Sequence, residues 1–299
     1  MTIESTIEEM ARAARIASRK MAGSSSVSKN EVLLKIAANI EKKSSYIKKE
    51  NKKDIAFARE KKLSGAMIER LTINDNTINS MADGLRKVAQ LNDPVGSLSK
   101  TWLRPNGLNV SKMRIPLGVI GIIYESRPNV TIDAAGLCLK AGNAVILRGG
   151  SEALNSNKAL TALVSQALVE TGLCKEAVQI VPVRNRTAVN FLLSQEEFID
   201  LIIPRGGEGL IRFVVENSKI PVLKHYKGVC HVYVDDGADL KIAEEICFNA
   251  KVQRPGVCNA METMLVHKSV APDFLPDMAK RFLGFAVEAP TVVSTEWAI

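Results

Sequence analysis

Short apolar runs alternate with helical patterns from residue 115 onward, and this alternation constrains the fold more than any other feature of the chain. Runs rich in Val, Ile and Leu predict strands at 118–124, 144–147, 178–183, 201–203, 220–223 and 231–234. Helical patterns lie between most of them, at 131–140, 151–171, 187–193 and 206–217. Strands that alternate with helices form parallel sheets with right-handed crossovers. The sequence therefore predicts an α/β fold with a doubly wound, Rossmann-like parallel sheet.

The first hundred residues carry helical patterns instead. Ser5 with Glu8, and Ser28 with Glu31, have the spacing of a capping box at the start of a helix. Apolar stripes at helical period follow them. A Pro-Asn-Gly turn signal then lies between two short β-like runs, which predicts a hairpin at 101–114.

The composition is that of a globular protein with one large or two ordinary domains. The chain has 299 residues, of which 46% are hydrophobic and 24% charged. No apolar run approaches the roughly 18 residues of a membrane span. Residues 1–21 lack the apolar core of a signal peptide. Five cysteines, an odd number without CxxC spacing, favour thiols in a reducing compartment. We therefore expect a cytoplasmic protein without membrane association.

The net charge of +8 comes largely from a lysine-dense segment at 42–62. A solvated helix face is the favoured interpretation of this segment. Nucleic-acid binding is the alternative, but aromatic residues make up only 5% of the chain and no recognition motif accompanies the charge. An anionic substrate and cofactor would explain a mild basic bias equally well. We expect no nucleic-acid partner.

Cys258 is the candidate nucleophile. It follows a helical pattern and lies in a turn punctuated by Pro255 and Gly256, just before an apolar strand-like run. Such a turn exposes and orients a thiol, and the nearby Arg254 and Lys251 favour the thiolate, which is the reactive form. A cysteine is more often a small buried hydrophobe, and that remains the interpretation for the other four.

Two glycine-rich loops follow predicted strands, at 148–152 and 204–209. Each carries an arginine and opens a helix, so its N–H groups and its cation suit phosphate oxygens at the carboxyl end of the sheet. Ordinary turn chemistry explains either loop alone, and the GxGxxG fingerprint is absent. Two such loops in one sheet favour a nucleotide site.

A third polar loop follows the strand predicted at 118–124. Within it, Asn129 offers a neutral amide donor and Arg127 a fixed cation. An asparagine that satisfies loop backbone is the competing interpretation. The three histidines show no metal-ligand spacing, so we expect no metal. A Cys–His thiol protease is disfavoured, because such a protease needs no nucleotide-binding sheet.

Six motifs resemble those of the gamma-glutamyl phosphate reductases (glutamate-5-semialdehyde dehydrogenases), a family within the aldehyde dehydrogenase superfamily. They are RPNGL at 104–108, RIPLGVIG at 114–121, YESRPNV at 124–130, KAGN at 140–143, IPRGG at 203–207 and QRPGVCNA at 253–260. The resemblance runs from the N-terminal helices to about residue 279. The stretch at 124–130 separates these reductases from ordinary aldehyde dehydrogenases, which disfavours a different aldehyde or acyl-phosphate substrate.

The resemblance implies roles for particular residues. Cys258 stands at the family's nucleophile position, and Asn129 matches the asparagine that helps to hold the oxyanion. Arg148 stands where the superfamily usually has a lysine that contacts the adenosine ribose of the cofactor. The implied cofactor contacts are Arg148, Gly149, Ser151, Arg205, Gly206 and Gly207, and the implied substrate contacts are Arg127, Arg254 and Asn259.

The implied reaction is the NADPH-dependent reduction of L-glutamyl 5-phosphate to L-glutamate 5-semialdehyde and phosphate through a cysteine thioester, in proline biosynthesis. Glutamate 5-kinase is the implied protein partner. Full-length members are expected to form homo-oligomers, with hairpin 101–114 in a bridging element. We expect an NADPH-binding domain at 1–250 and the start of a catalytic domain at 251–299.

The chain departs from ordinary aldehyde dehydrogenases just before the strand predicted at 231–234. Those enzymes carry there a glutamate that activates water, whereas residues 224–228 contain no carboxylate. The loss suits a reductase, because its thioester must not be hydrolysed. Lys224 and Lys227 would instead favour an anionic substrate.

After about residue 281 the sequence no longer follows the family pattern. We interpret this as a C-terminal truncation with a divergent tail. The alternative function is therefore a catalytically impaired remnant that binds NADP(H) without turnover.

Overall fold

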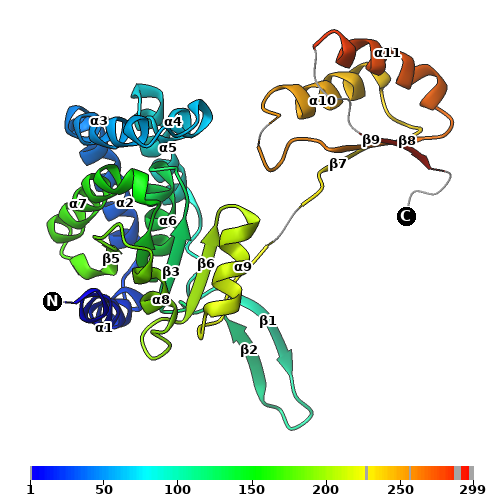
Figure 1. Ribbon diagram of the computed structural model, residues 1–299. Coiled ribbons are helices and arrows are strands. Elements are labelled where there is room, and N and C mark those ends of the chain that lie inside the picture. The colour runs from blue at the N-terminus through cyan, green and yellow to red at the C-terminus, as the bar shows by residue number, and fades with distance from the viewer. Residues whose placement is uncertain (1, 226–227, 256, 286–290, 296–299) are drawn as a thin grey trace. The chain divides into compact units, whose positions relative to one another are not determined.

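The computed structural model describes residues 2–225, 228–255, 257–285 and, for the backbone alone, 291–295. The chain divides into two compact units, Met1–Lys224 and His225–Ile299 (Figure 1). Each unit has its own parallel sheet and its own apolar core. The first unit ends before residue 250, the boundary expected for the cofactor domain, and that functional boundary stays a prediction.

Five helices open the first unit, as the sequence predicted. They are α1 (Ile3–Ala22), α2 (Ser26–Lys42), α3 (Ser44–Glu60), α4 (Gly65–Leu71) and α5 (Asp75–Gln90). Their N-caps lie three residues earlier than the capping-box spacing suggested. Thr2 and Ser25 cap α1 and α2, because their hydroxyl oxygens accept hydrogen bonds from the N–H groups of Ser5 and Ser28, each at 3.1 Å. Ser5 and Ser28 are therefore first-turn residues.

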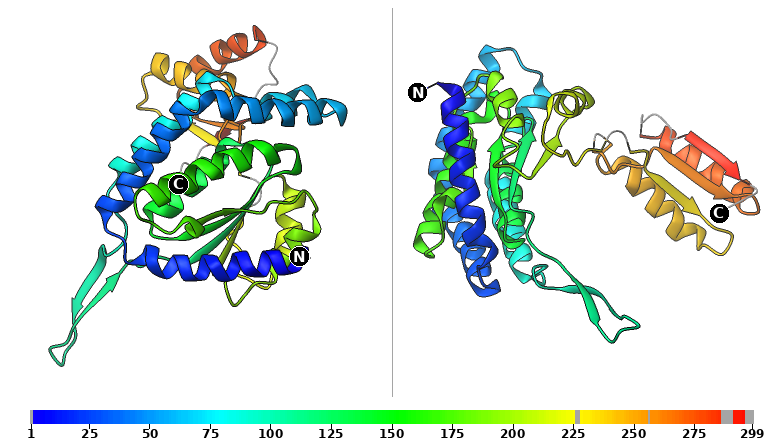
Figure 2. Two further views of the ribbon diagram at one scale, coloured as in Figure 1. Left: turned by 90° about the vertical axis from the view of Figure 1, so that its left-hand side faces the viewer. Right: turned by 90° about the horizontal axis from the view of Figure 1, so that it is seen from below.

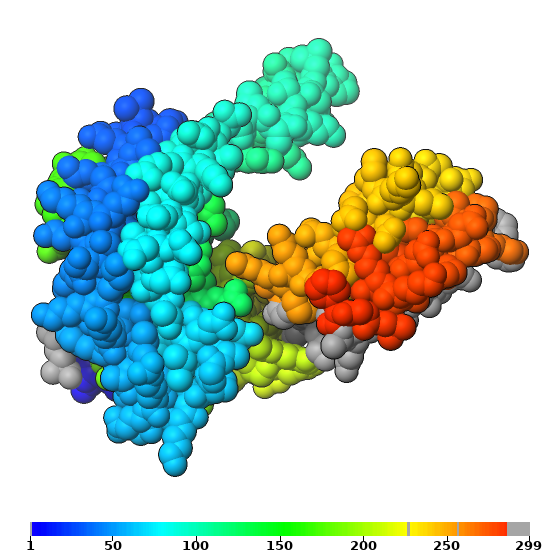
Figure 3. Space-filling view, turned by 90° about the horizontal axis from the view of Figure 1, so that it is seen from above, coloured from blue at the N-terminus to red at the C-terminus, as the bar shows by residue number. Residues whose placement is uncertain are grey.

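The predicted hairpin is formed by β1 (Leu98–Leu103) and β2 (Asn109–Met113), which pair antiparallel. Gly107 lies in its turn with φ of 84°, a left-handed conformation that glycine adopts without strain. The hairpin extends away from the helices and the sheet of its unit (Figures 2 and 3), and Leu103 on it is exposed.

Four parallel strands form the sheet of the first unit: β3 (Val119–Tyr124), β4 (Ala144–Arg148), β5 (Val178–Ile180) and β6 (Leu201–Arg205), in the order β5-β4-β3-β6. The helices that connect them are α6 (Asn129–Lys140), α7 (Leu154–Glu170) and α8 (Thr187–Leu193), with short 3-10 turns at Ser151–Ala153 and Lys175–Ala177, and α9 (Glu208–Asn217) follows β6. The strand predicted at 220–223 is reduced to one parallel bridge between Val222 and Ile202. Parallel strands linked through helices confirm the predicted α/β class.

Helices cover both faces of this sheet (Figure 2). Alternate residues of a strand point to opposite faces. Ile120 and Ile122 of β3 enter a core shared with α2, α5, α6 and α7. Val119 and Ile123 enter a second core shared with α1, α8 and α9. The sheet is therefore doubly wound, as the sequence predicted.

The second unit repeats the alternation on a smaller scale. It contains β7 (His231–Val234), α10 (Leu240–Val252), β8 (Thr263–His267), α11 (Ala271–Leu283) and β9 (Thr291–Thr295), with parallel strand order β7-β8-β9. Its core includes Cys247, Met264 and Phe274. The strand at 231–234 was expected to extend the first sheet, but it begins this separate sheet.

A buried carboxylate joins the N-terminal helices to the sheet layer. Asp54 of α3 is fully buried and accepts hydrogen bonds from the backbone N–H groups of Asn155 and Ser156, at 3.1 and 2.7 Å. It also accepts from both of their side chains, at 2.8 and 2.7 Å. Helix α7 has no cap from its own preceding residue, so Asp54 supplies the missing acceptor at its N-terminus.

We predict that Asp54→Ala lowers the free energy of unfolding of the first unit by about 2–4 kcal/mol, because the buried Ser156 N–H and the part-buried Asn155 N–H lose their acceptor. Urea unfolding followed by circular dichroism measures this. Asp75→Ala is the matched control, since the Asp75 side chain is 77% exposed and its ion pair with Lys48 lies at the surface. The control should cost no more than about 1 kcal/mol. Equal effects of the two substitutions would contradict the capping role.

Candidate active site

The predicted cofactor loops lie at the carboxyl edge of the four-stranded sheet. The chain runs outward from β3 through β4 to β5 and then returns to place β6 beside β3 (Figure 1). Strand order therefore reverses between β3 and β6, and ligands of doubly wound sheets bind outside the carboxyl ends at such a point. The loops that follow β3 and β6 flank this position.

The loop after β3 is held in an unusual backbone conformation. Ser126 has φ of 35°, which is uncommon for a residue other than glycine. Its backbone N–H and its hydroxyl both donate to Oε1 of Glu152, at 3.0 and 2.7 Å. Glu152 comes from the loop after β4, so the two loops are joined. Neither Ser126 nor Glu152 is among the site residues predicted from the sequence, although Glu152 lies within the glycine-rich loop at 148–152.

A second carboxylate joins the loops after β3 and β6. Oε2 of Glu125 accepts a hydrogen bond from the N–H of Gly207 at 3.0 Å, at the N-terminus of α9. A side chain at Gly206 would lie 2.6 Å from the carboxyl carbon of Glu125, so glycine is needed there for this approach. A phosphate that bound to the Gly207 N–H would have to replace the Glu125 carboxylate.

Arg148 ends β4 and is a buried cation. It is 7% exposed and donates to the carbonyl oxygens of Gly149 and Arg184, the latter at 3.2 Å. Its Nε has no hydrogen-bond partner among the described residues. Burial lowers the pKa of the guanidinium, Glu152 opposes that shift and Arg186 adds to it. The orphaned N–H leaves Arg148 with one unused donor at this edge of the sheet.

Two further arginines lie beside Arg148, after β5. Arg184 Nε donates to the carbonyl oxygen of Ser151 at 3.0 Å, and its guanidinium lies 4.6 Å from the ring centre of Phe57. Arg186 is close enough to Arg148 for its positive charge to lower the pKa of Arg148. We call Arg148, Arg184 and Arg186 the arginine cluster. The sequence did not predict Arg184 and Arg186 as site residues, because they follow a short strand without a glycine-rich signal.

Asn129, the predicted oxyanion donor, is the first residue of α6. Its amide nitrogen donates to Oδ2 of Asp133 at 3.1 Å, one turn along the helix. Burial raises the pKa of Asp133, and the bond from Asn129 opposes the rise. A side-chain amide carries two N–H donors, so this bond uses one of them. Arg127, the cation predicted in the same loop, is exposed.

Cys258 lies in the second unit, in the turn between α10 and β8, and it is exposed. Arg254 and Asn259, the predicted substrate contacts, are exposed in the same turn, and Gly256 lies outside the described residues. Cys230, just before β7, donates from Sγ to the carbonyl oxygen of Cys258 at 3.3 Å. The predicted order of helix, turn, exposed cysteine and strand is therefore observed.

Burial separates Cys258 from two of the other cysteines. Burial raises the pKa of Cys138 to about 12 and that of Cys247 to about 11. The pKa of Cys174 is also raised, by burial and by the neighbouring Glu176. A raised pKa leaves little thiolate near neutral pH. The exposure of Cys258 favours it over these three as the reactive thiol.

The predicted site residues thus form two groups, one in each unit. The first unit contains Asn129 and Arg127 with the residues of the two glycine-rich loops. The second contains Cys258, Arg254 and Asn259. The meeting of the two groups stays a prediction. Of the lysines expected to favour an anionic substrate, Lys224 is exposed and Lys227 lies outside the described residues.

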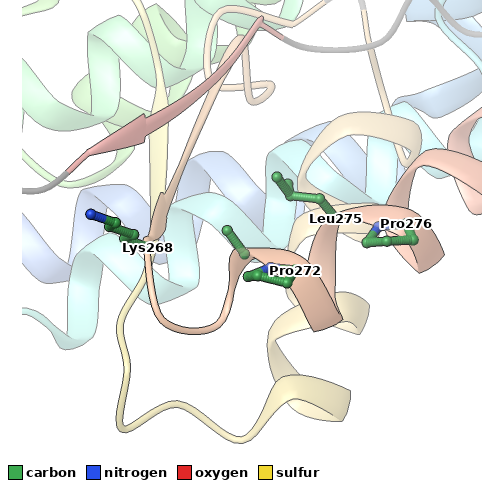
Figure 4. A pocket seen from close by; sticks show the side chains of 5 residues that line it. Lys268, Pro272, Leu275 and Pro276 are labelled. Atoms are coloured by element: carbon green, nitrogen blue, oxygen red, sulfur yellow. The ribbon is translucent and has the colours of Figure 1, made fainter.

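The pocket on α11 lies apart from the turn that carries Cys258. The described residues contain no group of three or more His, Cys, Asp or Glu side chains able to hold a metal ion. The pocket on α11 is lined by Lys268, Ala271, Pro272, Leu275 and Pro276 (Figure 4). It lies beyond the carboxyl end of β8, whereas Cys258 precedes the amino end of that strand.

Comparison with known proteins identifies the family. The aldehyde dehydrogenase family model matches residues 2–298. The chain belongs to the aldehyde dehydrogenase family. This membership confirms the predicted resemblance and fold class and makes the chain a member of a family of oxidoreductases that use a nicotinamide cofactor. Among the described residues, no helix has the length and apolar character needed to cross a membrane.

Curated relatives narrow the resemblance within this family. The gamma-glutamyl phosphate reductase of Desulfatibacillum aliphaticivorans is 61% identical over 94% of the chain and 67% of its own length. That of Thermodesulfovibrio yellowstonii is 52% identical over 99% of the chain and 71% of its own length. The chain thus spans about two thirds of the length of these aldehyde dehydrogenase family members.

Solved structures agree with the sequence comparison. The crystal structure of gamma-glutamyl phosphate reductase from Thermotoga maritima matches with a TM-score of 0.86 at 41% identity, covering 94% of this chain and 68% of that one. The enzyme from Saccharomyces cerevisiae matches with a TM-score of 0.68 at 30% identity, covering 96% and 80%. An acetylating aldehyde dehydrogenase from Geobacillus thermoglucosidasius, at 16% identity and a TM-score of 0.64, shares the fold.

The carboxyl edge of the first sheet fits the nicotinamide dinucleotide that aldehyde dehydrogenases use. Arg148 offers an orphaned N–H, and the arginine cluster suits phosphate oxygens. The Gly207 N–H, at the N-terminus of α9 beside the switch point, suits a phosphate oxygen that replaces the Glu125 carboxylate. Packing within the protein, and not approach to a cofactor, explains the glycine at position 149. A side chain there would collide with Asn157 and would lie 3.0 Å from the Tyr124 ring.

We predict that iodoacetamide modifies Cys258 before the buried thiols. At pH 8, Cys138 and Cys247 should react at least about 100-fold more slowly, because their raised pKa values and their burial leave little accessible thiolate. Peptide mapping by mass spectrometry measures the order of labelling. In urea, all five cysteines should react at similar rates. Labelling of Cys138 before Cys258 in the folded protein would overturn the assignment.

Proposed function

We propose that the chain catalyses the NADPH-dependent reduction of L-glutamyl 5-phosphate to L-glutamate 5-semialdehyde and phosphate. The observation that carries this proposal is its 52–61% identity, over 94–99% of the chain, to curated gamma-glutamyl phosphate reductases. The exposed Cys258 in the turn after α10 supports it. The reaction belongs to the biosynthesis of proline.

The Cys258 thiolate begins the reaction by attacking the acyl carbon of the substrate. The carbon–sulfur bond forms, the bond from carbon to the phosphate oxygen breaks, phosphate leaves, and a thioester on Cys258 remains. Asn129 and the Cys258 N–H stabilise the oxyanion, a contribution of roughly 3 kcal/mol for each donor in comparable sites. The bound cofactor supplies the hydride that reduces the thioester. Cys258 then leaves as the aldehyde forms.

Hydrolysis of the thioester must be slow for reduction to succeed. Residues 224–228 contain no carboxylate that could activate water. Phosphate is already a good leaving group, so no strong general acid is needed. Lys224 and Lys227, with Arg127, Arg254 and Asn259, supply cations and an amide for the anionic substrate. These assignments rest on the residue types and on the exposure of Arg127, Arg254 and Asn259.

The arginine cluster supports NADPH over NADH. NADPH carries a phosphate on the adenosine ribose, and an arginine beside that ribose accommodates it. Arg184 and Arg186 are exposed beside the buried Arg148, which stands at the family's ribose-contacting position. The three arginines repel one another, and a bound dianionic phosphate reduces that repulsion.

The remaining proposals concern location and partners. Five cysteines outside disulfides fit a reducing cytoplasm. The exposed hairpin β1–β2 is the element proposed for homo-oligomer contacts, since it presents Leu103 to solvent. Glutamate 5-kinase is the proposed source of the labile acyl phosphate.

We predict that Cys258→Ser abolishes reduction of NADP⁺ by glutamate 5-semialdehyde and phosphate, because a hydroxyl without an adjacent base is a poor nucleophile. Asn129→Ala should lower kcat about 100-fold with a smaller change in KM, since an oxyanion donor acts mainly in the transition state. Initial rates followed at the NADPH absorbance measure both. Cys174→Ser and Asn76→Ala are the controls, and both should keep the parent rate.

The outcomes separate the hypotheses. An effect of Asn129→Ala confined to KM would show that Asn129 only positions the substrate. A parent rate in Cys258→Ser would exclude Cys258 as the nucleophile. Calorimetric binding of NADPH without any turnover would favour the alternative, a protein that binds the cofactor and does not catalyse the reaction.

We predict that Arg186→Ala weakens NADPH binding by about tenfold or more, because a charge-assisted hydrogen bond contributes about 1.5–3 kcal/mol. NADH binding should change little. Isothermal titration calorimetry with both cofactors measures the ratio. Arg86→Ala, which removes an arginine of α5 whose side chain is 40% exposed, should leave both affinities unchanged. Equal losses for NADPH and NADH would show that Arg186 does not recognise the extra phosphate.

A further inference from the structure

Cys230 is bound to the turn that carries Cys258. Its Sγ donates to the Cys258 carbonyl oxygen at 3.3 Å. Its own carbonyl oxygen accepts from the N–H groups of Glu262 and Thr263, at 3.0 and 3.1 Å, where that turn enters β8. Both ends of the interaction lie in the second unit. The mechanism proposed above uses Cys258 and leaves Cys230 without a role.

The two thiols lie within reach of each other. Only three bonds separate the Cys258 carbonyl carbon from its Sγ, so the two sulfur atoms lie no more than ~8 Å apart. A disulfide requires the two Cβ atoms to approach to about 4 Å. Arg254, Pro255, Cys258 and Asn259 are all exposed, so little packing opposes that movement of the turn.

We propose that Cys230 is a resolving cysteine, which converts peroxide-oxidised Cys258 into a reversible Cys230–Cys258 disulfide. The inference rests on the proposed nucleophilic role of Cys258. The oxidant is hydrogen peroxide or another small hydroperoxide, and the reductant that restores the thiols is a low-molecular-weight dithiol.

The chemistry balances in two steps. The Cys258 thiolate attacks one peroxide oxygen, the O–O bond breaks and the other oxygen leaves as hydroxide, so sulfur is oxidised to a sulfenic acid and peroxide is reduced. Cys230 sulfur then attacks Cys258 sulfur. The S–S bond forms, the S–O bond breaks, and the departing hydroxide takes the Cys230 proton to give water.

The other cysteines do not offer this reaction to Cys258. Cys247 shares the second unit but is fully buried in its core, in one apolar cluster with Met264 and Phe274. Cys138 is buried in the core of the first unit, and the Cys174 thiol donates to a carboxylate oxygen of Glu176 at 3.0 Å. Cys230 is half-buried and already bonded to the Cys258 backbone. Pairing should therefore be selective.

The pairing would have a protective effect on the nucleophile. An exposed sulfenic acid without a partner thiol is oxidised further to sulfinic and sulfonic acids, which thiols do not reduce. A disulfide blocks Cys258 only until a dithiol reduces it. The same residue thus also positions the turn in the reduced state, through its bond to the Cys258 carbonyl.

The test treats the full chain with a small excess of hydrogen peroxide and maps its peptides without reduction. In the parent protein we expect a Cys230–Cys258 crosslink that dithiothreitol removes, with the Cys258 thiol recovered. Cys230→Ser keeps an O–H donor for the Cys258 carbonyl but cannot form a disulfide. It should accumulate about tenfold more Cys258 sulfinic acid. Cys247→Ser is the matched control and should behave as the parent.

Two further measurements keep the test decisive. The iodoacetamide rate of Cys258 in reduced Cys230→Ser should match that of the parent, which shows that the turn is intact. Absence of the crosslink in the parent, with equal Cys258 overoxidation in both proteins, would refute the proposal. Peptide mapping of the thiols does not depend on turnover. If the crosslink forms in the parent and Cys258→Ser keeps its catalytic activity, only the nucleophilic role of Cys258 is rejected.

Discussion

Burial of both faces of one parallel sheet is the constraint on which the first unit depends. Every residue of β3 and β4 is buried, so polar chemistry is excluded from the strands except at their ends. The reversal of strand order between β3 and β6 then selects the edge where the loops can hold a ligand. Arg148 is an example of a polar residue at a strand end. It is the last residue of β4, at that edge, and its Nε–H has no partner among the described residues.

Carboxylates organise the loops at this edge. Glu152 holds the strained Ser126, Glu125 occupies the Gly207 N–H, and Asp54 caps α7 from another helix. Each supplies an acceptor to N–H groups at a loop or helix start that would otherwise lack one. The cations of the arginine cluster lie among them. The edge is thus preorganised by charge, and an anionic cofactor has to compete with Glu125.

In the second unit, the interaction that bears on the proposed chemistry is the bond from Cys230 to the backbone of Cys258. It joins the start of β7 to the turn before β8 and leaves the Cys258 side chain exposed. Exposure suits a nucleophile and also makes it open to oxidation. The Cys230–Cys258 contact therefore bears both on the proposed nucleophile and on its proposed protection from overoxidation.

The sequence alone determined the α/β class, most helices and strands, the hairpin and the turn around Cys258, because these depend on local periodicity and turn chemistry. It misplaced the N-caps of α1 and α2 by three residues, since Thr2 and Ser5 offer similar local signals. Only the tertiary structure decided that 231–234 starts a separate sheet and that Arg184 and Arg186 lie beside Arg148. It alone showed the Cys230–Cys258 contact. These contacts join residues far apart in the chain, and no local pattern specifies which strands become neighbours.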